Sequence, residues 1–248
     1  MSKEFKPGSA LLSLLFYSAL FTFIGMRFNY TYEWFSLSGY FGSIAEGWVT
    51  TVILSIVSLF FSLIFGLILF FMKESKITTL RYISKVFNEV MFGSPLLVLV
   101  VILYYIVGRA FYVNDKFMAA VIILTLYNSA YISEIYRGGI ESIPDGQWKA
   151  AEVFGFSEFQ TYRYIVLPQV LKNILPPLTG QLALLVKSTA LLSYMAVNEF
   201  FNTMMGVNAN TFAYIEGYLV LALGYLIITI PISLSIKYME QKLQVVEQ

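Results

Sequence analysis

The fold is decided by a polar stretch, KAAEVFGFSEFQTYRYIVLP at Lys149–Pro168, which interrupts a chain that is otherwise strongly apolar. Its first part reads as a short helix. Asp145 stands at the position of a good N-cap, and Trp148, Ala151 and Phe154 recur at helical spacing. These residues predict an amphipathic helix with one apolar stripe.

A tight turn is predicted directly after this helix. Gly155 stands where a left-handed C-cap belongs, and Ser157 with Gln160 three residues later forms a capping-box pattern. We therefore expect a second helix, which stops at Leu167-Pro168. The residues alone leave two interpretations open. The hairpin lies flat on a membrane surface, or it docks on a cytoplasmic partner, since a fixed turn sets the angle of the first helix.

The composition of the chain indicates a membrane protein. Of its 248 residues, 58% are hydrophobic and 12% are charged, and the net charge is +1. Soluble domains carry about 25% charged residues, so the difference indicates a bilayer protein, and the net charge gives no reason to expect nucleic acid. The sequence contains no Cys and no His, which removes disulfides, thiolate and imidazole chemistry and the usual zinc ligands. We expect no metal site.

Six stretches are long and apolar enough to cross a bilayer, for which a helix needs about 20 residues. They are Gly8–Met26, Trp48–Met72, Ser94–Phe111, Phe117–Tyr136, Ile174–Met195 and Phe212–Ile236. The first run exceeds the core of a signal peptide and no cleavage motif follows it, so we expect an uncleaved helix.

Local signals predict where some of these helices begin, end or bend. Ser94 before Pro95 reads as an N-cap before a first-turn proline. The pair Gly138-Gly139 is expected to end the fourth span, and Pro231 predicts a kink in the last one.

The distribution of Lys and Arg predicts the orientation of the spans, because these residues favour cytoplasmic loops. Arg27, Arg109 and Lys116 lie on one side of a six-span chain, and Lys187 lies inside a span. The other side holds Lys3, Lys6, Lys73, Lys76, Arg81, Lys85, Arg137, Lys149, Arg163, Lys172, Lys237 and Lys242. Both termini and the polar stretch are therefore expected in the cytoplasm.

The polar stretch resembles the EAA loop of bacterial ATP-binding-cassette (ABC) importer permeases, whose pattern is EAA-x3-G-x9-I-x-LP. The matching residues are Lys149, Ala150, Ala151, Gly155, Ile165, Leu167 and Pro168, at the same spacing. Lys149 stands where the pattern has Glu. The resemblance implies that this loop, with Trp148 in its helix, couples the permease to its ATPase.

The resemblance extends from about Val49 to the C-terminus, and it is to the polar amino-acid branch with its histidine- and glutamine-type permeases. Three stretches carry it: FGSPLLV at 92–98, LYNSAYISEIYRGGIESIP at 126–144 and PPLTGQLALLVKSTALLSYMAVNEF at 176–200. It implies an all-α integral membrane fold with about six transmembrane helices. Residues 48–248 would form the five-helix type I core, with a coupling loop at 137–173. Residues 1–47 would add an N-terminal transmembrane helix and an extracytoplasmic loop.

The resemblance also implies the function and the partners. The chain would be a permease subunit that moves a polar amino acid across the bacterial cytoplasmic membrane by alternating access. It would not be an enzyme, because separate ATPase subunits would bind ATP and Mg²⁺ and hydrolyse the nucleotide. The further partners would be a second permease subunit, identical or similar, an extracytoplasmic amino-acid-binding protein and membrane lipid.

Polar groups inside a membrane are costly, so each is a candidate for the translocation path. Lys187 lies about 20 Å along its span at 1.5 Å per residue, too deep to reach the cytoplasmic surface. It could meet the carboxylate of a zwitterion, and a Glu could meet the amine. Alternatively, these groups pair with one another and hold helices together. The candidates are Asn128, Tyr131, Glu134, Gln181, Lys187, Thr189 and Glu199.

Two other functions are weighed against the importer. An ion-coupled secondary transporter of small polar solutes needs ion-binding residues deep in the membrane and often shows repeats, and neither is visible. An intramembrane enzyme is disfavoured because this chain has no His and no Cys, and because Asp115 and Asp145 both lie outside the expected spans. The chain also lacks a GxxxxGK[ST] phosphate loop, so energy from ATP must come from a partner.

Overall fold

The computed structural model describes residues 7–27 and 30–245, and this part of the chain is helical without a strand. The α-helices are α1 Pro7–Arg27, α2 Phe41–Lys73, α3 Thr78–Gly93, α4 Leu96–Ile102, α5 Lys116–Glu141, α6 Asp145–Val153, α7 Glu158–Thr161, α8 Leu167–Ser188, α9 Phe200–Thr211 and α10 Tyr214–Val245. Two 3₁₀ segments, η1 Trp34–Tyr40 and η4 Thr189–Met195, and two π-helical segments, η2 Leu103–Gly108 and η3 Tyr162–Val166, join them. The expected all-α membrane fold is confirmed.

The spans differ in detail from the six expected ones. Four segments of the described chain are long and apolar enough to cross a membrane, namely 34–73, 116–141, 158–195 and 214–241. A fifth span arises if α3 and the segment that follows it, α4 with η2, count as one span, although the two are bent by 113°. In α1 the apolar part, Leu11–Arg27, is shorter than the other spans. The five-helix core is thus four continuous spans and one bent pair.

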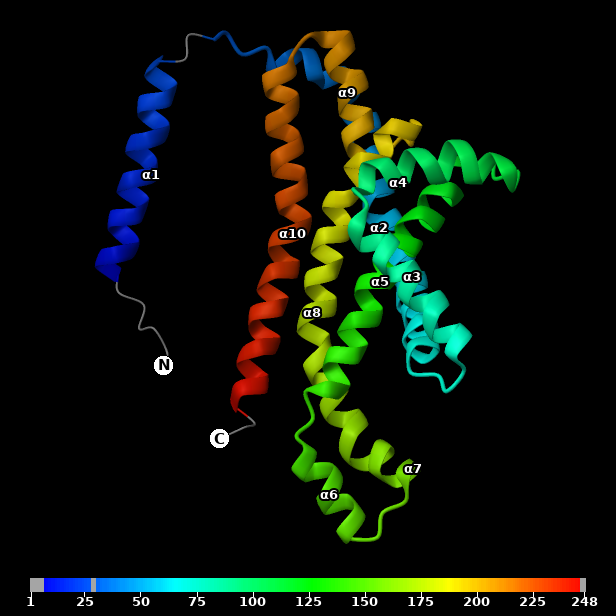
Figure 1. Cartoon of the computed structure of the whole chain (residues 1–248). Helices are drawn as coiled ribbons and strands as arrows, with labels where there is room; N and C mark the ends of the chain where they lie inside the picture. Colours follow the sequence, from blue (N-terminus) through cyan, green and yellow to red (C-terminus); the bar gives the residue numbers. More distant parts are fainter. Residues whose placement is uncertain (1–6, 28–29, 246–248) are drawn as a thin grey trace.

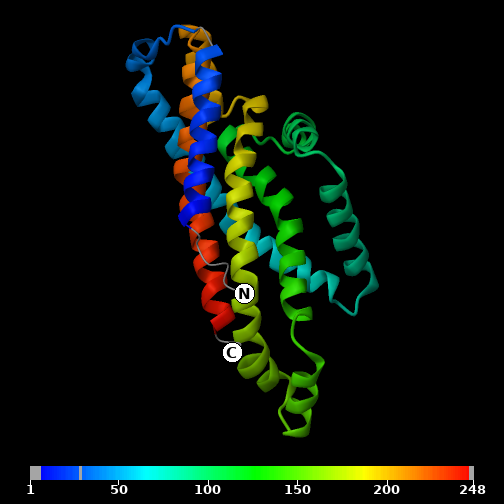
Figure 2. The same cartoon turned by 90° about the vertical axis from the view of Figure 1, so that its left-hand side faces the viewer.

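The core of the bundle is formed by α2, α5, α8 and α10, which run side by side (Figure 1, Figure 2). Helix α2 approaches α5 closely through small residues such as Ser58 and Ser62, both fully buried. A Cβ on Gly66 would lie 2.8 Å from Ile132 Cγ2, so only glycine permits this approach. Leu54, Val100, Leu124, Leu185 and Leu192 fill the adjacent interior.

One predicted helix end is wrong because a tertiary contact decides it. Helix α5 does not end at Gly138-Gly139 but continues to Glu141. Gly139 is buried, and a Cβ there would overlap Ile174 of α8, so this glycine serves close packing rather than termination.

The start of the third span is also wrong. Pro95, not Ser94, holds the N-cap position of α4, and the chain bends here between α3 and α4. Helix α3 lies between the second and third expected spans, and it is amphipathic. It carries Arg81 and Lys85 on its exposed face and Asn88 on its buried face.

The predicted stop at Leu167-Pro168 is wrong as well. The chain continues as a helix, because the N–H of Leu167 bonds to the carbonyl of Tyr162 and widens the coil to π geometry. Pro168 then lies in the first turn of α8, where a missing N–H costs little. Helix α10 runs through Pro231 as one element, and the kink predicted there stays a prediction.

Helix α1 stands apart from the bundle on the side of α10 (Figure 1). Its apolar side chains, such as Leu12 and Phe21, are exposed. The segment that follows is fastened to the core, since Glu216 of α10 accepts hydrogen bonds from the Glu33 N–H and from the Tyr30 hydroxyl at 3.0 Å. Glu216 therefore anchors the segment that follows α1 to the core.

Candidate functional site

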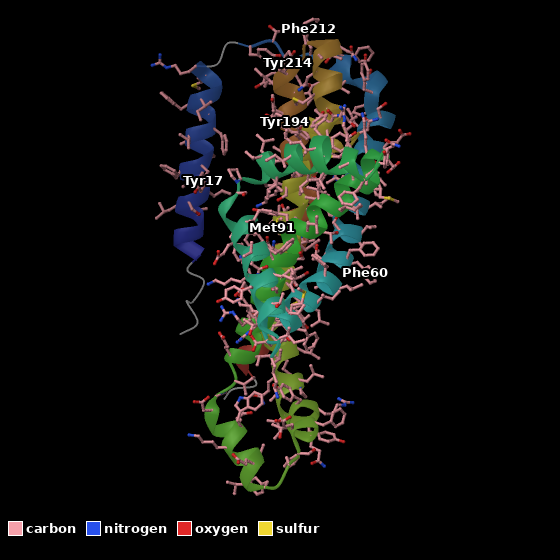
Figure 3. The ribbon with its side chains drawn as sticks, turned by 45° about the vertical axis from the view of Figure 1, so that its right-hand side comes forward. Tyr17, Phe60, Met91, Tyr194, Phe212 and Tyr214 are labelled. Carbon is pink, nitrogen blue, oxygen red and sulfur yellow. The ribbon has the colours of Figure 1, made fainter. Side chains whose placement is uncertain are left out.

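A helical hairpin made of α6, a glycine turn, α7 and η3 projects from one end of the bundle (Figure 1, Figure 2). Figure 3 shows this hairpin opposite the end that carries Phe212 and Tyr214. The hairpin contains every residue predicted for ATPase coupling except Leu167 and Pro168, which begin α8 directly behind it.

The turn of the hairpin is a Schellman motif. Gly155 has φ +76°, in the left-handed region that the sequence predicted. Its N–H donates to the Glu152 carbonyl at 3.0 Å, and the Phe156 N–H donates to the Ala151 carbonyl at 3.0 Å. These two bonds satisfy carbonyls at the end of α6 and fix the direction in which the chain leaves it.

The predicted capping box at the start of α7 is confirmed. The Gln160 N–H donates to Ser157 Oγ at 3.3 Å, and the Ser157 N–H donates to Gln160 Oε1 at 2.8 Å. The predicted N-cap of α6 is wrong by one residue, because Pro144 holds that position and Asp145 begins the helix. A carboxylate in the first turn still favours the helix dipole.

The hairpin is fastened to the bundle by polar and apolar contacts. Gln147 of α6 and Gln169 of α8 exchange two amide hydrogen bonds, one of them 3.1 Å long. Asn173 of α8 donates to Ser142 Oγ at 2.9 Å. An apolar cluster beneath the hairpin contains Ile143, Val166, Val170 and Ile174. These contacts make α6 one unit with the ends of α5 and α8.

The predicted apolar stripe of α6 divides between two environments. Ala151 is buried, and the Trp148 ring lies edge-on to Tyr162 with centroids 5.3 Å apart. By contrast, Phe154 is 79% exposed, and Val153 beside it is 85% exposed. The remaining coupling residues differ too: Lys149 and Ala150 are exposed, and Ile165 is half-buried.

The hairpin tip therefore presents apolar side chains to the outside. Phe159 on α7 of the same hairpin is also exposed, at 76%. The hairpin tip lies beyond the end of the bundle (Figure 2). Apolar side chains that gather at an exposed tip favour a protein or membrane contact.

Several polar residues of the spans form hydrogen bonds with one another. Asn128 of α5 and Gln181 of α8 are both buried, and Gln181 Nε2 donates to Asn128 Oδ1 at 2.6 Å. Tyr131 shares a hydrogen bond of 3.0 Å with Tyr127 one turn earlier. The Asn128–Gln181 bond ties α5 to α8, whereas the tyrosine pair lies within α5.

Glu134 is bound by three side chains from three helices. Its carboxylate accepts from Lys73 of α2, from Arg137 Nε of α5 at 2.7 Å and from Asn88 of α3 at 3.3 Å. The path candidates Asn128, Tyr131 and Glu134 of α5 thus bind separate partners. Sequence reasoning missed the role of Lys73, which it read only as a loop charge.

Thr189 and Glu199 are fully buried. Thr189 Oγ1 donates to the Val186 carbonyl at 2.8 Å. Glu199, which lies between two spans, caps α9 by accepting from the N–H groups of Asn202 at 2.6 Å and Phe201 at 2.9 Å. Burial raises the pKa of Glu199 to about 7, and these hydrogen bonds oppose the rise.

Lys187 is the candidate that the structure leaves without a counterion. Its side chain is exposed near the end of α8, and none of the carboxylates in residues 7–27 and 30–245 forms an ion pair with it. The same residues contain no group of three or more carboxylates that could hold a metal ion.

Comparison with known proteins connects this architecture to one family. The family described as binding-protein-dependent transport system inner membrane component matches residues 62–245. A probable glutamine ABC transporter permease protein of Bacillus subtilis is 31% identical over 204 residues, which are 82% of this chain and 94% of that protein. A putative glutamine transport system permease protein of Rickettsia conorii is 34% identical, over 81% of this chain and 92% of that protein.

Solved structures show the same arrangement. The crystal structure of an amino acid ABC transporter with histidines has a TM-score of 0.79 and 28% identity, and the match covers 86% of this chain and all of that one. An inward-facing methionine ABC transporter, MetNI, has a TM-score of 0.68 at 18% identity over 83% of this chain and 98% of that one, which shows the shared fold.

Proposed function

The chain belongs to the family of binding-protein-dependent transport system inner membrane components, and on this premise we propose that it is the permease subunit of an ABC importer for polar amino acids. The hairpin is the main support for this proposal, because a capped tip with exposed apolar side chains is suited to contact a partner protein. The names of the relatives supply the solute class. An ion-coupled secondary transporter fits these relatives less well.

The hairpin acts as the coupling element. Because the sequence lacks a GxxxxGK[ST] loop, ATP and Mg²⁺ bind to separate ATPase subunits, and this chain is not an enzyme. The ATPase grips Val153, Phe154 and Phe159, and its movement displaces α6. The bonds of Gln147 and Gln169 carry this displacement into α8, so the spans alternate between outward and inward access.

The remaining partners follow from the geometry of coupling. Two ATPase subunits each need one hairpin, so the chain works with a second permease subunit. A solute-binding protein delivers the amino acid on the outer side. Both termini and the hairpin face the cytoplasm of a bacterium, in agreement with the distribution of Lys and Arg.

Within the membrane, we assign different roles to the candidate path residues. Lys187 meets the carboxylate of the solute, because its ammonium is exposed and has no partner among the described carboxylates. Asn128, Gln181 and Tyr131 line the path and hold its walls. Glu134 and Glu199 hold helices together, because Lys73 of α2 donates to Glu134 and Thr51 of α2 and Tyr225 of α10 donate to Glu199. The Thr189 hydroxyl is occupied by the Val186 carbonyl one turn earlier.

Single-cysteine cross-linking tests this function, because the natural sequence has no cysteine. Val153→Cys at the tip should cross-link to the ATPase subunit in the assembled complex. Phe35→Cys, which is 89% exposed near the opposite end, is the matched control and should react only with an impermeant thiol reagent added from outside. A tip cysteine that never cross-links to an ATPase, or that the external reagent labels, would refute the proposal.

A further inference from the structure

A pocket lies where the hairpin joins the bundle. Its volume is about 330 Å³, within the range of roughly 300–1,000 Å³ that is usual for small-molecule sites. The end of α2, the end of α5 and the π segment η3 enclose it. We call it the junction pocket, and its main lining residues are Phe70, Phe71, Glu74, Arg137, Glu141 and Tyr162.

The junction pocket contains charges of both signs. Arg137 donates through Nε to Glu134 at 2.7 Å and through Nη1 to Glu141 at 2.5 Å, which leaves its Nη2 without a bond to any described residue. The Glu74 carboxylate likewise has no hydrogen bond or ion pair within residues 7–27 and 30–245, and neither does the Tyr162 hydroxyl. These groups can therefore bind something else.

The unused groups complement a free α-amino acid. Glu74 and Glu141 can accept from an ammonium group, and the guanidinium of Arg137 can donate to a carboxylate. The rings of Phe70 and Tyr162 provide an apolar wall for the side chain of the ligand. An inorganic anion would leave the Glu74 carboxylate unmatched, and an apolar ligand would leave both Glu74 and Nη2 of Arg137 unmatched.

The position of the pocket gives such a ligand control over coupling. Tyr162 contacts Trp148 of α6, and Arg137 is bonded to Glu134, which also holds Lys73 of α2. A ligand in the pocket therefore contacts the hairpin and α2 at once. It stabilises the arrangement of these two elements that this structure shows. A ligand that binds one arrangement better than another shifts the equilibrium toward it.

We propose that the junction pocket binds a free amino acid from the cytosolic side and slows the transport cycle while it is occupied. This inference rests on the proposed function, because the imported solute then accumulates on the side where the pocket opens. Occupancy keeps α2 and the hairpin from separating, so the imported product inhibits its own uptake.

The test uses the complete complex, with its ATPase subunits and binding protein, reconstituted in vesicles whose lumen corresponds to the cytosol. ATP and unlabelled glutamine are loaded inside, and the initial uptake of labelled glutamine from outside is measured. Uptake should fall as luminal glutamine rises. N-acetylglutamine in the lumen should not inhibit, because its nitrogen carries no charge.

Glu74→Gln should raise the luminal glutamine concentration needed for half-inhibition by about tenfold, since one charge-assisted contact is lost, and Glu74→Asp should restore part of the sensitivity. Each variant is normalised to its own rate with an empty lumen. The control Glu89→Gln changes an exposed carboxylate on α3 whose ion pair within residues 7–27 and 30–245 is with Lys85 at 3.8 Å, and it should respond like the wild type.

The outcomes separate the two proposals. If the wild-type complex takes up no amino acid from outside, the proposed function fails. If uptake occurs but ignores luminal glutamine, or if Glu74→Gln is inhibited at the wild-type concentration, the junction pocket proposal alone is overturned. Inhibition by N-acetylglutamine equal to that by glutamine would overturn it as well.

Discussion

The same substitution at two glycines of the hairpin should have opposite effects. Gly155 and Gly146 lie at the two ends of α6, and an added Cβ would meet no atom within 4 Å at either position. Steric overlap therefore contributes nothing, and only the backbone conformation distinguishes the two sites. Gly155 has φ +76°, whereas the φ of Gly146 lies outside the left-handed range.

The magnitudes follow from this difference. An alanine held in the left-handed region costs about 1–2 kcal/mol, so Gly155→Ala should destabilise the Schellman turn by this amount. Gly146→Ala should instead stabilise the helix by about 0.5–1 kcal/mol, because alanine loses less backbone entropy than glycine. Gly155→Val should exceed Gly155→Ala, since a β-branched residue fits this region least.

Two assays measure the effect in the assembled complex. Hydrogen exchange of the amides between Ala151 and Gln160 should become about 5–30-fold faster in Gly155→Ala, which is the factor that corresponds to 1–2 kcal/mol. Solute uptake per ATP hydrolysed should fall in the same variant, while insertion into the membrane is unchanged. Gly146→Ala should show wild-type exchange and uptake or slightly slower exchange.

The result that contradicts this reasoning is specific. Wild-type exchange and uptake in Gly155→Ala would mean that the left-handed turn does not hold α6 in place. Equal losses in both variants would mean that any side chain near the tip disturbs the ATPase contact, and the backbone argument would then be wrong.

Three further substitutions are predicted with the thermal unfolding of the purified protein as the first measurement. Glu134→Gln should lower stability by about 1.5–3 kcal/mol because it breaks charged hydrogen bonds among three helices, whereas Glu89→Gln at an exposed pair should change it by less than about 1 kcal/mol; equal effects would contradict this. Gly139→Ala should destabilise by about 1–3 kcal/mol because its Cβ overlaps α8, whereas Gly138→Ala has open space and should not, so a stable Gly139→Ala would show that α5 and α8 separate freely. Lys187→Met should keep wild-type stability and ATPase binding but raise the solute concentration for half-maximal uptake about tenfold or more, and unchanged uptake would exclude a contact with the solute carboxylate.

The accuracy of the sequence predictions follows the range of the interactions involved. The left-handed Gly155 and the capping box of Ser157 and Gln160 were readable because a few adjacent residues determine them. Of the two helix ends that failed, one depends on a distant residue and the other on a local π turn that the residue pattern did not signal. Gly139 looked like a terminator, but its role is set by Ile174, and Pro168 looked like a stop, although the π turn before it lets the helix continue.

The same distinction explains which predicted site residues the fold brings together. The coupling residues are close in the sequence and lie together in one hairpin and the start of α8, whereas their role in coupling stays a prediction. The path residues could not be sorted in this way, because their partners lie far away in the sequence: Gln181 is 53 residues from Asn128, and Glu134 is 61 residues from Lys73. Only the fold shows that these groups are paired with one another.

Because the other path candidates are bound by neighbouring groups, Lys187 needs a separate explanation. An ionised side chain within a span is costly unless a counterion, water or a polar ligand reaches it. Lys187 has no such counterion among the carboxylates that the structure describes, and its side chain lies at the surface of α8. Its partner must therefore come from outside this part of the chain. A second permease subunit and a solute carboxylate are the two sources that the proposed assembly supplies. They are distinguishable, because removing a subunit contact lowers the stability of the complex, whereas removing a solute contact changes only uptake.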